Sequence, residues 1–105
     1  MISSDIMRGF NDTLILALLE KGDSYGYDIS KQITDLSNNE YNIKETTLYS
    51  ALNRLEKNAY IVSYTGGIIK GRERIYFKIT KTGKKYLLEK KREFHEIIEL
   101  INKFI

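Results

Sequence analysis

The sequence has no cysteine, no proline and no tryptophan, and it contains a single histidine among 105 residues. Without cysteine the chain forms no disulfide and offers no thiolate as a nucleophile or metal ligand. One histidine excludes a histidine-rich zinc site, so we expect no metal site and no cofactor. The chain also lacks a phosphate-binding glycine motif and a plausible pair of catalytic carboxylates. These absences argue against an enzyme and leave no catalytic residue to name.

Long apolar runs are missing too. The longest, residues 14–19, is far too short to cross a bilayer, and residues 1–10 do not resemble a signal peptide. We therefore expect a cytoplasmic protein with no membrane association. A chain of 105 residues makes one small domain and buries limited surface alone, which favours pairing with a partner chain.

Positive charge is concentrated in one part of the chain. Residues 60–92 hold ten Lys or Arg and two Asp or Glu, a net charge of +8, whereas the whole chain carries only +3. Such a block favours binding to nucleic acid or another anionic surface. A solvated, lysine-rich helix face explains the lysines after residue 80 equally well. It explains less well Lys70, Arg72 and Arg74, which lie beside a glycine-rich turn.

Apolar spacing predicts three helices in the first half of the chain, over residues 11–21, 24–36 and 44–58. The third is the clearest, with Leu48, Leu52 and Leu55 on one side and Asn42 at capping-box spacing from Glu45. Its opposite side carries hydroxyl, amide and ammonium groups, which suit phosphates and base edges. Either this is an ordinary solvated face or it contacts DNA through Thr46, Tyr49, Ser50, Asn53 and Lys57.

The pattern then changes to that of a β-hairpin over residues 61–79, with glycines at its turn. In the second strand, residues alternate between a mostly apolar set and a set that contains Arg72, Arg74 and Tyr76. A period of two predicts that the apolar set, including Ile75 and Phe77, faces the core while the cationic set is exposed.

A last helix follows Thr80, a good N-cap residue, and is expected to reach Ile105. Its apolar residues are close to heptad spacing, and they are too many for a helix that stands alone in water. We predict that this helix joins two copies of the chain through Leu87, Phe94, Ile97, Ile98, Ile101, Phe104 and Ile105.

The order of elements predicts a mainly α fold with a small β-hairpin. Residues 1–80 form a winged helix-turn-helix domain, and residues 81–105 form a long C-terminal dimerisation helix. In this arrangement the third helix enters the major groove and the hairpin, or wing, lies along the phosphate backbone. The predicted partners are double-stranded DNA and a second copy of the chain. The alternative is a winged-helix protein-interaction module that binds no DNA.

Three stretches resemble the PadR family of transcriptional regulators. They are "GDSYGYDI" at residues 22–29, "TLYSALNRLEKNAYI" at residues 47–61 and "RERIYFKITKTG" at residues 72–83. The resemblance covers nearly the whole chain, and the combined order is more specific than any one motif. The single C-terminal helix is similar to that of the short members, and Ala59 stands where the family usually has Gly.

The resemblance implies a homodimeric, usually repressing regulator that reads an inverted repeat. The family's recognition tyrosine corresponds to Tyr49, and its wing cations correspond to Lys70, Arg72 and Arg74. Phe94 lies where some members place an aromatic residue that stacks on flat apolar molecules between the subunits. Phe94 is therefore a candidate contact for a small aromatic effector, and ordinary interface packing is the alternative.

Overall fold

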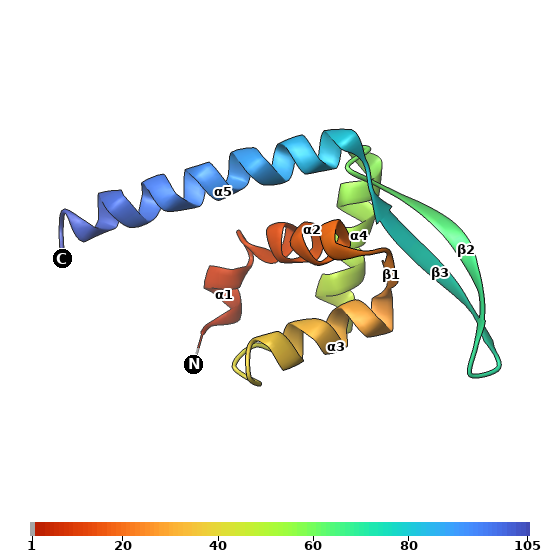
Figure 1. Cartoon of the computed structure of the whole chain (residues 1–105). Coiled ribbons are helices and arrows are strands. Elements are labelled where there is room, and N and C mark those ends of the chain that lie inside the picture. The colour runs from red at the N-terminus through yellow and green to blue at the C-terminus, as the bar shows by residue number, and fades with distance from the viewer. Residues whose placement is uncertain (1) are drawn as a thin grey trace.

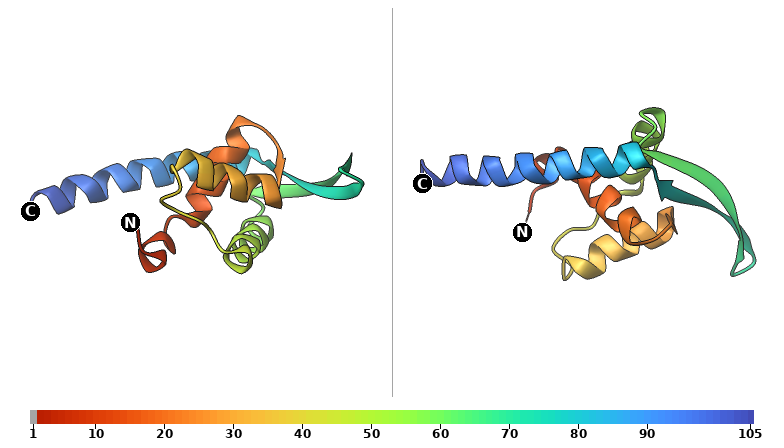
Figure 2. Two further views of the ribbon diagram at one scale, coloured as in Figure 1. Left: turned by 90° about the horizontal axis from the view of Figure 1, so that it is seen from below. Right: turned by 45° about the horizontal axis from the view of Figure 1, so that its top comes forward.

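The computed structural model describes residues 2–105, apart from the side chain of Ile69. The helices α2, α3 and α4 form a head, and the β2–β3 hairpin and α5 project from it in opposite directions (Figure 1 and Figure 2). This confirms the mainly α, winged helix-turn-helix fold. The elements in chain order are α1 (Ser4–Met7), α2 (Asn11–Lys21), β1 (Ser24–Tyr25), α3 (Gly26–Leu36), α4 (Glu45–Lys57), β2 (Ile61–Ile69), β3 (Arg72–Ile79) and α5 (Lys81–Asn102).

The core lies where α2 packs between α3, α4 and the start of α5. Because α2 is apolar on several sides, it buries residues toward each neighbour at once. The side chains with almost no exposure include Ile15, Leu16, Leu19, Ile29, Leu48, Leu52, Leu55, Ile61 and Leu87. The assignment of Leu87 to the dimer interface is therefore wrong, since it is 1% exposed and already buried against its own chain. Heptad spacing identifies an apolar face but not which neighbour covers it.

The start of α4 differs from the sequence prediction. Lys44 is the N-cap residue and makes no side-chain capping hydrogen bond. The Asn42 side chain instead accepts a hydrogen bond from the Thr34 hydroxyl at 2.8 Å. The expected capping box between Asn42 and Glu45 is thus absent from the described chain, and the Glu45 side chain is exposed.

The sheet contains a strand that the sequence did not predict. Its order is β1-β3-β2, all antiparallel, with Ser24 opposite Phe77 and Tyr25 opposite Tyr76. Two residues are too few to show a period of two, which explains why β1 was missed. Because β1 leads directly into α3, its pairing with β3 joins the helical head to the wing.

The two faces of β3 are not simply buried and exposed. Phe77 is buried as predicted, but Ile75 is 51% exposed because the hairpin extends beyond the head (Figure 1). On the supposedly exposed face, Arg74 and Tyr76 are partly covered. The reason is β1, whose Tyr25 packs against both side chains.

The junction between α4 and β2 shows why the family usually has Gly where this chain has Ala59. Ala59 has φ of +61°, in the left-handed region. The amide of Ala59 donates to Glu56 O and that of Tyr60 donates to Leu55 O, which is the hydrogen-bond pattern of a Schellman motif. Glycine is the residue favoured at this position because it has no Cβ to strain.

We predict that Ala59→Gly stabilises the fold. Relief of the left-handed strain, about 1–2 kcal/mol, outweighs the extra backbone entropy of glycine, about 0.5–1 kcal/mol. Chemical denaturation should show a gain of about 0.5–1 kcal/mol in the free energy of unfolding. The same change in a helix interior, Ala17→Gly, should lower that free energy by about 1 kcal/mol. An unchanged or lower stability for Ala59→Gly would contradict the strain argument.

The beginning of α5 follows the prediction. The Thr80 hydroxyl accepts a hydrogen bond from the Gly83 amide at 3.0 Å and donates one to Ala59 O at 2.7 Å. Gly83 is buried, and a Cβ there would collide with the backbone oxygen of Tyr60. This close approach sets where α5 leaves the sheet. The helix ends at Asn102, slightly before the predicted end.

A buried polar pair links α2 to the loop before α4. The Tyr41 hydroxyl donates to Asn11 Oδ1 at 2.6 Å, and both residues are less than 9% exposed. Burial raises the pKa of Tyr41 above its ordinary 10.0. Since the folded chain holds Tyr41 protonated more strongly than the unfolded chain does, its contribution to stability is present below pH 10 and declines above it.

Tyr41→Phe tests this pair. At neutral pH it should lower the free energy of unfolding by about 1–3 kcal/mol, because Asn11 Oδ1 is left buried without its donor. As the pH rises above 10 the difference between wild type and variant should shrink, since only the wild type loses the Tyr41 contribution. Urea denaturation at several pH values measures both effects. A difference that is constant with pH would show that Tyr41 does not titrate in this range.

Candidate nucleic-acid interface

A groove of about 440 Å³ lies between the start of α3, the first half of α4 and the beginning of the wing strand β3. It brings together three residues that the sequence predicted as DNA contacts, namely Tyr49 from α4 and Arg72 and Arg74 from β3. These residues are distant in sequence and meet because β1 pairs with β3. The groove is lined by Gly26, Tyr27, Ser30, Ile43, Glu45, Leu48, Tyr49, Arg72 and Arg74.

Tyr49 is 43% exposed, and its ring lies against the first residue of α3. A Cβ on Gly26 would collide with the Tyr49 hydroxyl, so this contact requires glycine. The N-cap residue of α3, Tyr25, makes no side-chain capping hydrogen bond. The phenol is therefore placed beside a helix N-terminus, whose free amides and partial positive charge favour an anion.

Arg74 is held by aromatic side chains. Its guanidinium lies 5.2 Å from the centre of the Tyr25 ring, a cation–π arrangement. Tyr25, Tyr76 and Tyr64 follow one another across the three strands, with ring centres 5.4 and 5.8 Å apart. We call these three residues the tyrosine ladder. Arg74 Nε is buried and has no hydrogen-bond partner within the described residues.

The outer end of the tyrosine ladder is tied to the loop before β1. The Tyr64 hydroxyl donates to Asp23 Oδ2 at 2.6 Å, and this hydrogen bond raises the pKa of Tyr64. The ladder thus fixes the base of the wing against the start of α3. Lys70 and Arg72, further along, are exposed, and Lys70 sits at the hairpin turn with φ of +52°.

The remaining predicted contacts on α4 are exposed but do not line the groove. Thr46 and Ser50 border a separate hollow next to Arg8, and Asn53 and Lys57 lie further along the helix. The predicted polar side of α4 is therefore divided between the groove, the hollow next to Arg8 and the exposed second half of the helix.

Arg54 has a structural role. Its guanidinium contacts the Asp12 carboxylate through two hydrogen bonds, of 2.5 and 3.0 Å. The hydrogen bond to Asp12 raises the pKa of Arg54. The pair joins α4 to α2 and leaves Arg54 engaged within its own chain.

The predicted interface residues on α5 divide into two groups. Phe94 is half-buried and packs on Phe10 of the same chain, with ring centres 4.6 Å apart. The predicted residues beyond Phe94 are exposed. Leu88 and Leu100 are exposed as well, and sequence reasoning missed them. The exposed members of the predicted stripe are Ile97, Ile98, Ile101, Phe104 and Ile105.

Sequence reasoning also missed two residues of the groove. Glu45 was left out because the polar side of α4 was counted from Thr46, although Glu45 is the first residue of that helix. Gly26 was noted only as allowing close approach to a phosphate. The glycine between two tyrosines in "YGYDI" was the available signal, since a glycine at the start of a helix, between two bulky residues, suggests close approach of another group to the backbone.

A helical head with a helix-turn-helix and a hairpin wing is the winged-helix class of transcriptional regulators. No helix in residues 2–105 is both long enough and apolar enough to span a bilayer. Residues 15–89 match the model of the transcriptional regulator PadR-like family. The chain belongs to this family, whose members are regulators of transcription and not enzymes.

Solved structures support this assignment. A transcriptional regulator from Clostridium thermocellum is 52% identical, with a TM-score of 0.92 over 100% of this chain and 99% of that one. A PadR family transcription regulator from Clostridium difficile R20291 is 40% identical, with a TM-score of 0.79 over 90% and 97%. Bacillus subtilis PadR in complex with operator DNA is 28% identical, with a TM-score of 0.69 over 79% of this chain and 46% of that one.

A double-mutant cycle tests the contact between Gly26 and Tyr49. Gly26→Ala alone should force the Tyr49 ring out of its place and destabilise the fold. In a Tyr49→Ala background the same change should be neutral or stabilising, because alanine favours the helix and nothing remains to collide with it. Urea denaturation should give a coupling energy of about 0.5–3 kcal/mol between the two sites. Additive effects would show that the ring does not depend on Gly26.

Proposed function

We propose that this protein is a homodimeric DNA-binding repressor that reads an inverted repeat. Residues 1–80 form the DNA-binding head, and residues 81–105 the dimerisation helix. The observation that carries the proposal is the groove in which Tyr49, the start of α3 and the wing arginines converge. A relative with the same fold, Bacillus subtilis PadR, has been solved with operator DNA. The relatives named above come from bacteria, whose DNA lies in the cytoplasm, and the proposed function therefore implies a cytoplasmic location.

The wing cations contact the phosphate backbone in this proposal. Arg72 and Arg74 border the groove, and Lys70 extends the positive surface to the hairpin turn. Phosphate contacts of this kind fix the orientation of the protein without reading sequence. The Tyr49 hydroxyl, held at the start of α3, fits a phosphate as well.

The exposed polar side of α4 reads the bases. Asn53 carries an amide, which suits the paired donor and acceptor of adenine in the major groove. Thr46 and Ser50 offer hydroxyls, and Lys57 near the end of the helix offers a cation for a phosphate. All four side chains are exposed on α4.

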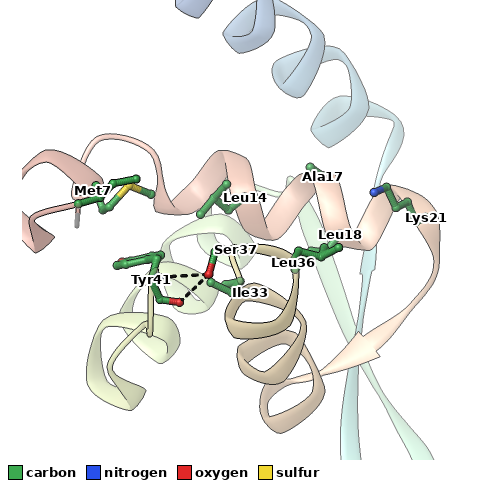
Figure 3. Close-up of a pocket in the computed structure, with 10 residues that line it drawn as sticks. Met7, Leu14, Ala17, Leu18, Lys21, Ile33, Leu36, Ser37 and Tyr41 are labelled. Carbon is green, nitrogen blue, oxygen red and sulfur yellow. Dashed lines mark hydrogen bonds between the residues drawn. The ribbon is translucent and has the colours of Figure 1, made fainter. Parts of the chain in front are cut away.

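The proposed dimerisation is supported by two exposed apolar surfaces on the same chain. One is the outer stripe of α5, whose exposed members were given above. The other is an apolar groove of about 330 Å³ between α1, α2 and α3, lined mainly by aliphatic side chains (Figure 3). In a two-fold dimer each copy both gives and receives such a contact. We propose that the end of α5 of one copy covers the apolar groove of the other, formed by Ile2, Met7, Leu14, Ala17, Leu18, Ile33, Leu36 and Tyr41.

A small aromatic effector stays a prediction. Phe94 packs on Phe10 and retains partial exposure, so a dimer would place the Phe10–Phe94 pair close to the interface on α5. A planar molecule that stacks there should raise the melting temperature of the dimer.

Measurements of DNA binding by variants should distinguish the role of the wing from that of α4. A gel shift and footprint on the DNA upstream of its own gene should first reveal an inverted repeat, with half-site centres about 34–36 Å apart or a multiple of this. Arg72→Ala should then weaken binding to all duplexes and lower the salt slope by about one. Asn53→Ala should cost about 1–3 kcal/mol on the repeat and much less on random DNA. Lys103→Ala, which removes a cation at the far end of α5, should change neither property.

Folded variants at Arg72, Arg74 and Tyr49 that bind DNA like wild type would remove the groove from DNA binding. The protein-interaction module would then be the better description of this chain. Circular dichroism provides the folding control.

The oligomeric state should depend on the outer half of α5. Ile101→Glu should convert a dimer into a monomer, since burying an apolar side chain of this size stabilises by roughly 1.5–3 kcal/mol and a buried charge reverses the sign. The neighbouring Asn102→Glu adds the same charge at an exposed polar position and should leave the dimer intact. Sedimentation analysis at micromolar concentration measures both.

A substitution in the apolar groove gives a second test of the proposed dimer. Leu36 is 65% exposed within one chain, so Leu36→Glu should preserve the fold. It should weaken the dimer if the groove receives α5 of the partner. A wild type that is monomeric at micromolar concentration would overturn the homodimer itself.

A further inference from the structure

One acidic side chain lies in the proposed DNA-binding groove. Glu45 is the only carboxylate among the residues that line it, and it shares the groove with Arg72 and Arg74. It is the first residue of α4 and is exposed. It takes part in none of the ion pairs found within residues 2–105. The two arginines are therefore not neutralised by Glu45, and its carboxylate faces the groove unpaired.

A carboxylate at a DNA-facing surface is repelled by phosphates, so the contact that suits it is a hydrogen-bond donor on a base. In the major groove only cytosine N4 and adenine N6 supply one. The amino group of adenine stands beside the N7 acceptor, which repels a carboxylate. Guanine offers acceptors at this edge, and thymine offers an acceptor and a methyl group. Cytosine is thus the base that fits.

The position of Glu45 agrees with a reading role. In helix-turn-helix proteins the first residues of the recognition helix contact the base edges. Tyr49, one turn later, is turned toward Gly26 and the start of α3 and so is placed for a phosphate. Glu45, in the first turn of α4, is then the side chain placed to enter the major groove of the DNA beside Tyr49.

We propose that Glu45 is a specificity-determining residue that selects cytosine at one position in each half-site. This inference rests on the proposed DNA-binding function of the groove. The competing explanation is a structural one, in which a negative charge in the first turn merely stabilises α4 through the helix dipole. The two roles differ in their consequences for base preference.

Selection from a duplex library with a randomised central segment distinguishes them. The wild type should enrich cytosine at one position per half-site, with a preference of roughly 5- to 100-fold over other bases. Glu45→Gln should move that preference to adenine, because a glutamine amide pairs with both N6 and N7 of adenine. Glu45→Asp keeps the charge and the dipole interaction but shortens the side chain, so the cytosine preference should fall.

Glu40→Gln is the matched control. Glu40 is exposed in the loop before α4, and its substitution removes one negative charge without touching the groove. It should raise affinity for all duplexes slightly and change no base preference. Circular dichroism and thermal melting check each variant, and Glu45→Asp carries the test if Glu45→Gln fails to fold.

Unchanged base preferences in Glu45→Gln and Glu45→Asp would overturn the inference while leaving DNA binding intact. A gain in affinity equal to that of Glu40→Gln, with no change in preference, would overturn it in the same way. A wild type that enriches no sequence and binds no duplex would instead overturn the proposed function.

Discussion

The pairing of β1 with β3 is the constraint on which the proposed DNA-binding surface depends. Two residues, Ser24 and Tyr25, attach the start of α3 to the wing strand. The attachment places Tyr25 under the Arg74 guanidinium. It also brings Gly26 to a position where the Tyr49 ring can rest on it. Without this short strand β3 would have β2 as its only neighbour in the sheet, and a two-stranded hairpin is marginally stable at best in water where it extends beyond the core.

The groove is therefore assembled by contacts that are small individually. The tyrosine ladder gives the root of the wing three rings in contact, of which Tyr64 and Tyr76 are stacked, and the hydrogen bond from Tyr64 to Asp23 closes its outer end. None of these side chains is deeply buried, so aromatic packing at the surface adds to the buried contacts of Ile61, Phe77 and Ile79, and the tip of the wing extends beyond the head. A positive surface built in this way is held firmly where the wing joins the head and can adjust at the tip of the wing, which suits contact with a phosphate backbone.

Much of the fold could be predicted from the sequence because α3, α4 and α5 carry clear apolar periods and α2 contains a continuous apolar run. Periodicity does not say which element covers an apolar face. For that reason Leu87 was assigned to a partner although α5 begins by packing on its own core. Short elements such as β1 carry no period, and their absence from the prediction hid the partial burial of Arg74. In the site, Tyr49, Arg72 and Arg74 were predictable from residue type and order, whereas Glu45 and Gly26 gain their meaning only from the contacts around them.

The paired hydrogen bonds between Arg54 and Asp12 have a consequence for operator architecture. They fix α4 to α2, the helix that also forms one wall of the apolar groove proposed to hold the partner. In the proposed dimer the distance and rotation between the two α4 helices are then set by a rigid body and not by a flexible linker. One extra base pair between half-sites shifts them by about 3.4 Å and turns them by about 35°. The proposed dimer is then expected to discriminate operators by the spacing of their half-sites as well as by their base sequence.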